Sequence, residues 1–484
     1  MYDLLVIGGG INGTGIARNA AGRGLDVVLC EKDDLAQHTS SASTKLIHGG
    51  LRRALIERES LLRAAPHIIW PMRFVLPHHS ALRPAWLIRL GLFLYDHLGG
   101  RKALPPTRML HRDKTDKLDP LKDMYRMAFE YSDCWVEDSR LVVLNAVDAR
   151  KQGAEILTRT ACTSLVRHRD HWEASLSDAK GVRRVKARAV INAAGAWVDD
   201  ILGLQGPGTA PHLRLVKGSH IIVRKHHEGS HAYFLQNTDG RIIFAIPYES
   251  GEFTLIGTTD IPFDADRDKV EITQAEIDYL CAAVSEYYRD PVLSEQVIST
   301  YSGVRPLYDD HARQASKVTR DYVLKRNADG GAPILSVFGG KITTYRELAE
   351  DALDVMAADF PAMAEPWTRR ACLPGGDIPG GDFDGFLKGL VSRYPGFEQA
   401  FLYRLARAYG TDTVNLLGDT ETFAALGESF GSGLTEAEVR YLVEREFAAT
   451  PEDIIWRRSK LGLHMTETEF QSLADWMLHH VASA

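Results

Sequence analysis

The chain has 484 residues, of which 45% are hydrophobic and 25% are charged, and its formal net charge is −7. This is the composition of an ordinary globular protein that is long enough for about three domains. It argues against a disordered or fibrous chain, and the acidic balance argues against a protein whose main partner is nucleic acid.

The spacing of the cysteines and the length of the apolar runs indicate in which cellular compartment the protein lies. The five cysteines are scattered and include no Cys-x-x-Cys pair, so we predict neither a disulfide framework nor a zinc ribbon, and we assign no metal ligands. No basic segment precedes the short apolar run near residue 1, and no run of eighteen apolar residues occurs. We therefore expect a cytoplasmic protein without a transmembrane helix, which leaves attachment to a membrane surface open.

The first thirty residues predict a strand, a helix and a second strand. Residues 3–7 and 25–30 are short apolar runs suited to buried parallel strands, and residues 11–22 indicate a helix with small residues on one side. The glycine fingerprint Gly8-x-Gly10-x-x-Gly13 joins the first strand to this helix. Its glycines allow the turn, the approach of a pyrophosphate and close packing of helix on strand.

An acidic residue completes the dinucleotide signal. Glu31 ends the second strand, where a carboxylate can bind ribose hydroxyls. A fingerprint this close to residue 1 suits FAD in many flavoproteins, and neither a second fingerprint for NAD(P)H nor a redox Cys-x-x-Cys follows. We therefore predict FAD as the cofactor and a small substrate, rather than a nicotinamide, as the electron donor.

Loops and strands alternate through the middle of the chain. Residues 37–50 are polar and glycine-rich, which is typical of a loop that contacts a polar ligand, and residues 187–196 indicate a strand that ends in a glycine turn. The clearest β region spans residues 212–260. Its expected strands are residues 220–223, 233–236, 241–246 and 253–257. An Asp239-Gly240 hairpin separates the second from the third, and a turn at 249–252 separates the third from the fourth.

The last third of the chain changes from glycine turns to helices. Residues 301–307 and 336–346 are compact turn motifs, and the second leads into a helix over 344–356. We interpret the Pro- and Gly-rich residues 374–381 as a linker. Beyond it, Thr435-x-x-Glu438 is typical of a capping box at the start of a helix.

Six runs of the sequence resemble, in the same order, the FAD-dependent glycerol-3-phosphate dehydrogenases, in particular the aerobic respiratory enzyme. They are Ile-Gly-Gly-Gly-Ile-Asn-Gly, Thr-Ser-Ser-Ala-Ser-Thr-Lys-Leu-Ile-His-Gly-Gly-Leu-Arg, Lys-Gly-Ser-His, Gly-Thr-Thr-Asp, Tyr-Ser-Gly-Val-Arg-Pro-Leu and Phe-Gly-Gly-Lys-Ile-Thr-Thr-Tyr-Arg. The resemblance covers nearly the whole chain. It implies an α/β fold with a Rossmann-type FAD-binding domain of the glutathione-reductase-like class, an antiparallel β substrate domain and an all-helical C-terminal domain.

The resemblance also implies domain limits and a reaction. The FAD-binding domain would comprise residues 1–75, 145–205 and 300–365, the substrate or cap domain residues 76–144 and 206–299, and the helical domain residues 382–484. The implied reaction oxidises sn-glycerol 3-phosphate to dihydroxyacetone phosphate by hydride transfer from C2 to N5 of FAD, with electrons passed to membrane quinone. The implied location is the inner face of the cell membrane, attached peripherally, and the oligomeric state stays open, a homodimer included.

Site residues follow from the same motifs. The resemblance implies Arg52, Arg305 and Arg320 as substrate-binding residues and His220, Arg305 and Lys341 as catalytic candidates. The residues that it implies for FAD lie in the fingerprint, in the 37–50 loop and in two later glycine turns: Gly8, Gly10, Gly13, Glu31, Ser40, Ser41, Lys45, Leu46, His48, Gly49, Gly195, Gly340, Lys341 and Thr343.

The chemistry of these residue types agrees with the implied roles. A phosphorylated polyol needs fixed cations for its dianion, and arginine can bind phosphate through two parallel hydrogen bonds. His220 could accept the C2 hydroxyl proton because imidazole titrates near neutral pH, and Lys341 could stabilise reduced flavin as a nearby cation. The base could equally be Arg305 or Lys341, and the sequence leaves this choice open.

The sequence departs from the family pattern directly after Arg52. Arg53 stands where the family has a tyrosine of the substrate site, and the helical segment that normally follows is missing before residues 56–67. A deletion here would displace Arg52 or remove part of the pocket wall, and a misplacement of about 1 Å can lower a rate on the order of a hundredfold. FAD binding is expected to survive, because its residues lie elsewhere.

Two other functions and one surface stay open. An amine or 2-hydroxy-acid oxidase would share the architecture, although a carboxylate needs fewer cations than a phosphate dianion. A flavin-binding protein with impaired turnover would result if the missing segment abolished activity. Residues 83–102 are apolar and aromatic with flanking basic residues, which favours either contact with anionic lipid or a buried helix of the substrate domain.

Overall fold

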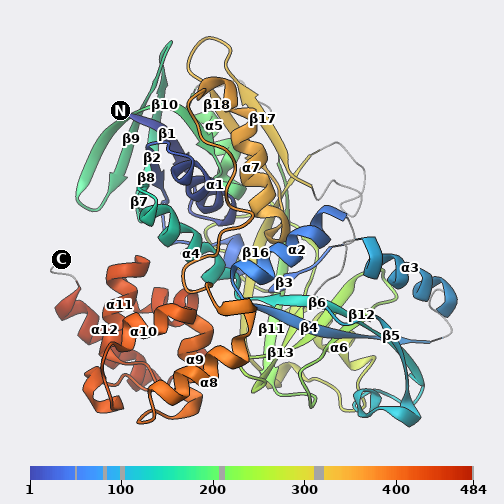
Figure 1. Cartoon of the computed structure of the whole chain (residues 1–484). Coiled ribbons are helices and arrows are strands. Elements are labelled where there is room, and N and C mark those ends of the chain that lie inside the picture. Colours follow the sequence, from blue (N-terminus) through green and yellow to red (C-terminus); the bar gives the residue numbers. More distant parts are fainter. Residues whose placement is uncertain (50–51, 80–83, 99–103, 206–212, 310–320, 482–484) are drawn as a thin grey trace.

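The computed structural model describes residues 1–49, 52–79, 84–98, 104–205, 213–309 and 321–481. The described chain forms two β-sheets and a separate group of C-terminal helices, which lies at the lower left of Figure 1. This arrangement confirms the predicted α/β fold with a helical C-terminal domain.

The first sheet contains the predicted βαβ unit: β1 (Tyr2–Ile7), α1 (Ile11–Gly22) and β2 (Val27–Cys30). Its strand order is β17-β18-β10-β1-β2-β7, and the pairs from β18 to β7 are parallel. Strands β8 and β9 extend the sheet from β10 by antiparallel pairing. The other strands are β7 (Glu155–Leu157), β8 (Ala161–Arg167), β9 (Trp172–Asp178), β10 (Gly181–Asn192), β17 (Val323–Asn327) and β18 (Ile334–Phe338).

Alternate side chains of β1 face two different cores. Leu4 and Val6 pack with α1, α4 (Asp138–Lys151) and α7 (Tyr345–Val355). Leu5 and Ile7 pack against the β8–β9 hairpin. A strand that is buried on both faces needs a continuous apolar run, which explains the sequence of residues 3–7.

The second sheet is the larger one. Its order is β15-β11-β14-β13-β12-β4-β6-β3, with β16 paired to β11 and β5 to β6. Its strands are β3 (Leu46–Ile47), β4 (Ile69–His78), β5 (Arg108–His111), β6 (Met127–Val136), β11 (Leu213–Arg224), β12 (Ala232–Gln236), β13 (Ile242–Tyr248), β14 (Phe253–Gly257), β15 (Ile261–Pro262) and β16 (Val297–Tyr308). Gly240, with φ +83°, turns the chain between β12 and β13, as its hairpin sequence predicts. Helix α6 (Gln274–Ser285) covers one face of the sheet.

Strand pairing differs from the predicted domain limits at three segments. Strand β3 and most of β4 fall within residues 1–75, yet both strands pair with β6 in the second sheet. Most of β16 falls within residues 300–365, yet it pairs with β11. These pairs join distant parts of the chain, such as Ile69 and Val136, so no local pattern marks them. The division of the chain into domains stays a prediction.

The C-terminal helices pack around one apolar core. They are α8 (Phe383–Arg393), α9 (Gln399–Tyr409), α10 (Thr413–Leu417), α11 (Glu436–Glu446) and α12 (Glu467–His480). The stretch interpreted as a linker is packed tightly. A Cβ on Gly375 or Gly376 would lie 2.0 Å from the carbonyl oxygen of Tyr409 or 2.2 Å from that of Ala64.

The capping box predicted at Thr435 is wrong, although α11 does begin at the next residue. Among the described residues the Thr435 side chain has no hydrogen-bond partner. Glu438 instead accepts hydrogen bonds from Arg404 (2.7 Å) and from the Tyr409 hydroxyl (2.6 Å). Glu438 is fully buried, and a buried carboxylate must be compensated by such partners.

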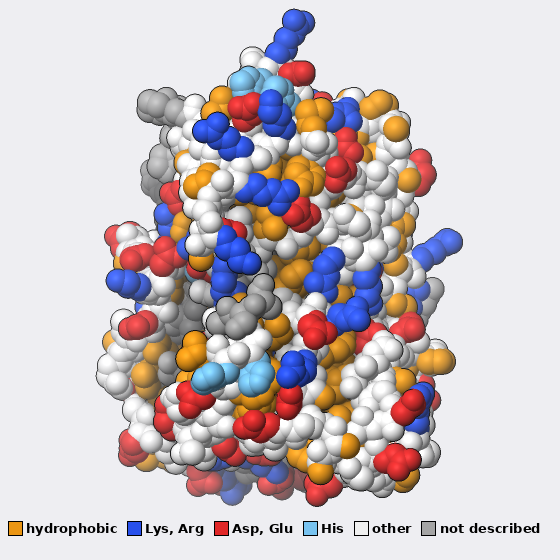
Figure 2. Space-filling view, turned by 90° about the vertical axis from the view of Figure 1, so that its left-hand side faces the viewer, with side chains coloured by type: hydrophobic (Ala, Val, Ile, Leu, Met, Phe, Trp, Pro, Cys, Tyr) orange, Lys and Arg blue, Asp and Glu red, His pale blue; other side chains and the backbone are white. Residues whose placement is uncertain are grey.

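Three further α-helices of the described chain are α2 (Arg52–Ala64), α3 (Ala85–Leu98) and α5 (Val198–Gly203). No helix in the described ranges is long and apolar enough to cross a membrane. On the face shown in Figure 2, acidic and basic side chains are interspersed. This face therefore carries no surface of a single charge sign.

A buried ion pair joins the C-terminal domain to the first sheet. Arg458 donates a hydrogen bond to Asp34 at 2.8 Å, and both side chains are fully buried. Arg457 donates to the same carboxylate at 2.5 Å. Because Asp34 follows the end of β2 closely, the C-terminal domain fixes the position of the loop after Glu31.

We expect Asp34→Ala to destabilise the protein by about 3–5 kcal/mol, because it leaves the buried Arg458 charge without its partner. The measurement is the melting temperature in a thermal scan. Glu228→Ala is the matched control, because it removes an exposed partner of Lys225 and should cost less than about 1 kcal/mol. Equal losses in the two variants would contradict the anchoring role of Asp34.

Candidate active site

The glycine fingerprint leaves no room for side chains between β1 and α1. Gly8 has φ +115°, and a Cβ there would lie 2.5 Å from the carbonyl oxygen of Ala193. A Cβ on Gly13 would lie 1.9 Å from the carbonyl oxygen of Gly8. The turn and the close approach of helix to strand are therefore both present in the structure.

A cavity of about 180 Å³ opens beside this turn, and its wall includes Gly8, Gly10, Glu31, Ser40 and Gly195. The Glu31 carboxylate accepts hydrogen bonds from the backbone nitrogens of Gly9 (2.6 Å) and Asp33 (2.9 Å), and burial raises the pKa of its carboxyl. Each carboxylate oxygen can accept a further hydrogen bond. The glycine backbone at the N-terminus of α1 can bind the pyrophosphate of FAD, and the Glu31 carboxylate at the other end of the cavity can bind its ribose.

Two further segments meet the fingerprint. Asn12 donates a hydrogen bond to the carbonyl oxygen of Gly339 (3.1 Å), beside Gly340 at φ +104°. The Thr343 hydroxyl donates to the carbonyl oxygen of His48 at 3.0 Å, and the His48 nitrogen donates back at 3.2 Å. These contacts bring the predicted residues of the 37–50 loop and of the later glycine turn to one place, although the role of each toward FAD stays a prediction.

The 37–50 loop is itself held by buried groups. Lys45 is almost fully buried, pairs with Asp138 at 2.6 Å and donates to the carbonyl oxygen of Ser41 at 3.1 Å. Leu46 is buried in β3. Ser41 and Lys45 also line a second cavity of about 260 Å³, together with residues of the C-terminal domain. Lys45 therefore positions the loop, whatever it contributes to the cofactor.

Strands β11 and β16 bring His220 and Arg305 to one region. In their pairing Gly218 lies opposite Gly303, between the pairs His220–Tyr301 and Val216–Arg305. A Cβ on Gly218 would lie 3.0 Å from the Arg305 guanidinium, and one on Gly257 would lie 2.1 Å from the His220 ring. Gly218 and Gly257 thus leave the space that the arginine and the histidine occupy, whereas a Cβ on Gly303 would lie 2.6 Å from Ala42 of the 37–50 loop.

His220 is fully buried and stays neutral near pH 7. Its Nε2 lies 3.0 Å from the Thr44 hydroxyl, and its ring stacks on Tyr301 at 4.7 Å. Its Nδ1 has no hydrogen-bond partner among the described residues. Burial, and then the charges of Arg305 and Lys45, lower the pKa of the imidazole well below its ordinary value. A neutral ring with a nitrogen to spare can accept a proton from a ligand.

The remaining predicted cations lie in different settings. The Arg305 side chain is 34% exposed, forms an ion pair with Asp260 and lies 3.4 Å from the Thr258 hydroxyl. Arg52 is exposed at the first residue of α2, and Lys341 is exposed just before the 3-10 turn Ile342–Thr344. Arg320 lies outside the described residues. Within the described ranges, His220 therefore lies near Arg305, and Arg52 has no such contact with either of them.

The short segment after Arg52 is helical from its first residue. Arg346 of α7 donates two hydrogen bonds of 2.7 Å to Glu57, and both side chains are buried. Arg53 pairs with Glu347 at 3.2 Å and remains 62% exposed. Helix α2 is thus anchored on α7, so the end that carries Arg52 has a fixed support.

Four positioning residues escaped the sequence analysis: Thr44, Asp138, Asp260 and Tyr301. Thr44, Asp260 and Tyr301 stand inside motifs that carried the resemblance, which was the available signal. Their roles depend on pairing across strands, because Tyr301 faces His220 only through the β11–β16 register. Asp138 is recognisable only once Lys45 is known to be buried.

Comparison with known proteins gives consistent matches over the whole chain. Residues 3–346 match the family described as FAD dependent oxidoreductase, and residues 367–480 match the C-terminal domain of alpha-glycerophosphate oxidase. The D-erythritol 1-phosphate dehydrogenase of Brucella abortus is 52% identical, with 98% of this chain and 97% of that protein covered. The aerobic glycerol-3-phosphate dehydrogenase of Escherichia coli is 45% identical, with 99% and 97% covered.

A solved structure agrees with these matches. The glycerol-3-phosphate dehydrogenase of Bacillus halodurans, complexed with FAD, superposes with a TM-score of 0.78 at 26% sequence identity. The superposition covers 100% of this chain and 95% of that one. The cofactor is therefore FAD, in agreement with the sequence analysis.

We expect Gly8→Ala to lose most of its bound flavin, because the new Cβ would collide with the backbone of Ala193 and distort the turn that leads to the phosphate-binding N-terminus of α1. The measurement is the flavin-to-protein absorbance ratio of the purified protein. Gly24→Ala is the matched control: its φ is +86°, and no described atom lies within 4 Å of the added Cβ. It should cost about 1 kcal/mol of stability and keep its flavin. Equal flavin loss in both would assign the effect to backbone strain alone.

Proposed function

Because the chain belongs to the FAD-dependent oxidoreductase family, in the group that contains the glycerol-3-phosphate dehydrogenases, we propose that it oxidises sn-glycerol 3-phosphate to dihydroxyacetone phosphate. The observation that carries the proposal is the pairing of β11 with β16, which sets a neutral histidine beside an arginine in a space made by glycines. When bound, FAD supplies the acceptor for the hydride that leaves C2. We further propose membrane quinone as the final electron acceptor.

Arg305 is proposed to bind the phosphate of the substrate. Its guanidinium is partly exposed and is held by Asp260 and Thr258, so it is oriented and can still be reached from solvent. A phosphate dianion can replace part of the Asp260 interaction with stronger charge-assisted hydrogen bonds. Arg52 and Arg320 are proposed to add the further positive charge that a dianion requires.

His220 is proposed to take the proton of the C2 hydroxyl. Its lowered pKa keeps the ring neutral near pH 7, which is the form that can accept a proton. Thr44 and Tyr301 orient the ring, and its Nδ1 has no partner within the described part of the chain. Lys341 and Arg305 remain the alternative bases, and the exposure of Lys341 makes it less suited to hold a proton in a water-free site.

D-erythritol 1-phosphate is a second candidate substrate. Two observations favour it: the 52% identity to the Brucella abortus enzyme, and the start of α2 directly at Arg52. A missing segment of pocket wall would make room for one additional hydroxymethylene carbon. The reaction and the roles of Arg305 and His220 would be the same for both substrates.

The test is to mix the purified holoenzyme anaerobically with sn-glycerol 3-phosphate and to follow the visible flavin band. We expect rapid bleaching, and we expect Arg305→Ala to need about 10–100 times more substrate, because a hydrogen bond to a charged group contributes about 1.5–3 kcal/mol. The exposed Arg224, at the far end of β11, provides the control variant Arg224→Ala.

The same assay separates the candidates. Faster bleaching by D-erythritol 1-phosphate would assign the longer substrate. An FAD-loaded enzyme that neither polyol phosphate bleaches would contradict the proposed function, and bleaching by an amino acid or a 2-hydroxy acid would favour the oxidase alternative.

Helix α3 is proposed to contact the membrane surface. None of residues 85–98 is buried, which disagrees with the alternative of a buried helix. Figure 1 shows α3 at the margin of the molecule, on the side away from the C-terminal helices. Its exposed apolar side chains, spaced as on one helical face, include Trp86 (69% exposed), Leu90 (48%) and Phe93 (55%). The flanking basic residues 83, 101 and 102 lie outside the described ranges.

We expect the double variant Trp86→Ser, Phe93→Ser to bind phosphatidylglycerol-containing vesicles at least tenfold more weakly, because each aromatic side chain can bury roughly 150–250 Å² in the interface. Sedimentation with vesicles measures the binding. Reduction of a soluble dye should stay unchanged. Leu478→Ser, at an exposed apolar position of α12 (67%), is the control. Unchanged binding of the double variant would show that another surface attaches the protein.

A further inference from the structure

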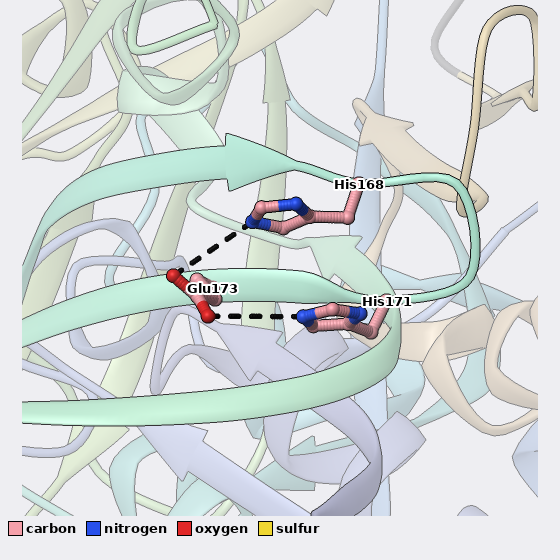
Figure 3. Close-up of side chains that lie close together, drawn as sticks. All are labelled: His168, His171 and Glu173. Carbon is pink, nitrogen blue, oxygen red and sulfur yellow. Dashed lines mark ion pairs between the residues drawn. The ribbon is translucent and has the colours of Figure 1, made fainter.

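The turn between β8 and β9 gathers three metal-ligating side chains away from the cofactor cleft. The backbone nitrogen of His168 donates to the carbonyl oxygen of His171 at 2.9 Å, so the two histidines close the turn. Glu173 follows on β9 two residues after His171, which places both on the same face of the hairpin. Figure 3 shows both imidazole rings directed toward the Glu173 carboxylate.

The three side chains leave a gap of the size of a metal ion. Nε2 of His168 lies 3.7 Å from one Glu173 oxygen, and Nε2 of His171 lies 3.8 Å from the other. These separations are too long for hydrogen bonds. Two ligands on one zinc ion, each at about 2.0–2.2 Å, lie roughly 3–4 Å apart. The present distances therefore match ligand atoms around an ion.

Both imidazoles present a nitrogen that nothing else uses. Within the described ranges, Nε2 of His168 and Nε2 of His171 are withdrawn from water and have no hydrogen-bond partner. The two rings stack with centroids 4.5 Å apart and planes 8° apart, so one ring has to turn out of the stack before both Nε2 lone pairs meet at one ion. Nδ1 of His171 lies 2.8 Å from the Asp170 carboxylate. A carboxylate at Nδ1 is the usual support that turns Nε2 of a histidine toward a metal.

A second group of possible ligands gives a useful contrast. Glu31, Asp33 and His38 also lie close together. Their atoms are already engaged, because Glu31 accepts from two backbone nitrogens and Nε2 of His38 lies 2.7 Å from Asp33. That group belongs to the cofactor cleft. The hairpin group differs in having two imidazole nitrogens without partners.

We propose that His168, His171 and Glu173 bind a divalent transition-metal ion of the zinc class. Two imidazoles and one carboxylate suit Zn²⁺ and its neighbours, whereas Mg²⁺ and Ca²⁺ prefer oxygen ligands alone. The side chains of His168 and Glu173 are each 41% exposed, so an ion can reach the hairpin from solvent. The sequence analysis assigned no metal ligands, because His-x-x-His-x-Glu gains meaning only when a tight turn folds it.

The hairpin is already fixed in the folded chain, which favours binding. The backbone nitrogen of Ala332 donates to the carbonyl oxygen of His168 at 2.9 Å, and Arg167 donates to the carbonyl oxygen of Asn327 at 2.9 Å. The ion would therefore meet oriented ligands and would tie β8 to β9. One competitor is present: Lys186 lies 2.8 Å from Glu173 and must share or release that carboxylate.

The experiment uses tag-free holoenzyme, freed of metal by chelation and titrated with ZnCl₂ in a calorimeter. We expect the wild type to bind one equivalent of zinc at this site. The double variant His168→Gln, His171→Gln should not bind it. Asp170→Asn should bind about 10–100 times more weakly, because supporting partners of metal ligands have effects of this size. Lys186→Gln should bind more tightly, because the competing cation is gone.

Controls separate the site from an ordinary ion pair. His97→Gln changes an exposed histidine on α3 and should bind zinc as the wild type does, and MgCl₂ should give no heat at this site. Flavin content and the metal-free melting temperature report that each variant is folded. Zinc also should raise the melting temperature of the wild type but not of the double variant. Equal zinc uptake by the wild type and the double variant, or tighter binding of Mg²⁺, would overturn the proposal.

Discussion

The segment from Glu31 to Lys45 is fixed by two buried charge pairs, and the rest of the site depends on where they hold it. Asp34 pairs with Arg458 of the C-terminal domain, and Lys45 pairs with Asp138 of α4, with all four side chains almost fully buried. Separating either pair would leave an uncompensated charge in the interior, at a cost of several kcal/mol. Between these anchors, Thr39 donates to the carbonyl oxygen of β16 residue Val304 at 2.7 Å. This one loop therefore contacts α4, β16 and the C-terminal domain, and it fixes their positions relative to the cofactor cleft.

Glycines on β11, β14 and β16 leave space between these strands, because they carry no side chain. Gly218 and Gly303 face each other across β11 and β16, and Gly257 lies opposite His220 across β11 and β14. Interior packing is dense, so a space of this kind persists only where no Cβ can fill it. The histidine uses one such space and the arginine another. Gly218 and Gly257 thus leave room for the two site side chains, and Gly303 leaves room for Ala42 of the 37–50 loop.

The sequence predicted what local patterns determine. The strand–helix–strand unit around the glycine fingerprint and the Asp239-Gly240 hairpin depend on neighbours within a few residues, and the structure confirms these elements. The role of Glu31 toward the cofactor stays a prediction. The capping box at Thr435 failed because Glu438 is used by Arg404 and Tyr409, which no local pattern reveals. For the same reason the sequence does not reveal that β3, β4 and β16 pair within the second sheet. Thr44 and Tyr301 were missed because their contacts with His220 arise only from the tertiary fold.

The charges around His220 also connect substrate binding with proton transfer. Burial, Arg305 and Lys45 all lower the pKa of the imidazole. Lys45 is paired with the buried Asp138, whereas Arg305 is paired with Asp260 and both of these side chains are partly exposed to solvent. On the proposed function, a phosphate dianion bound at Arg305 would offset that positive charge. A nearby negative charge favours the protonated form of an imidazole, so the substrate itself would raise the basicity of His220. The histidine would then be a weak base in the empty site and a stronger one when the hydroxyl proton has to be removed.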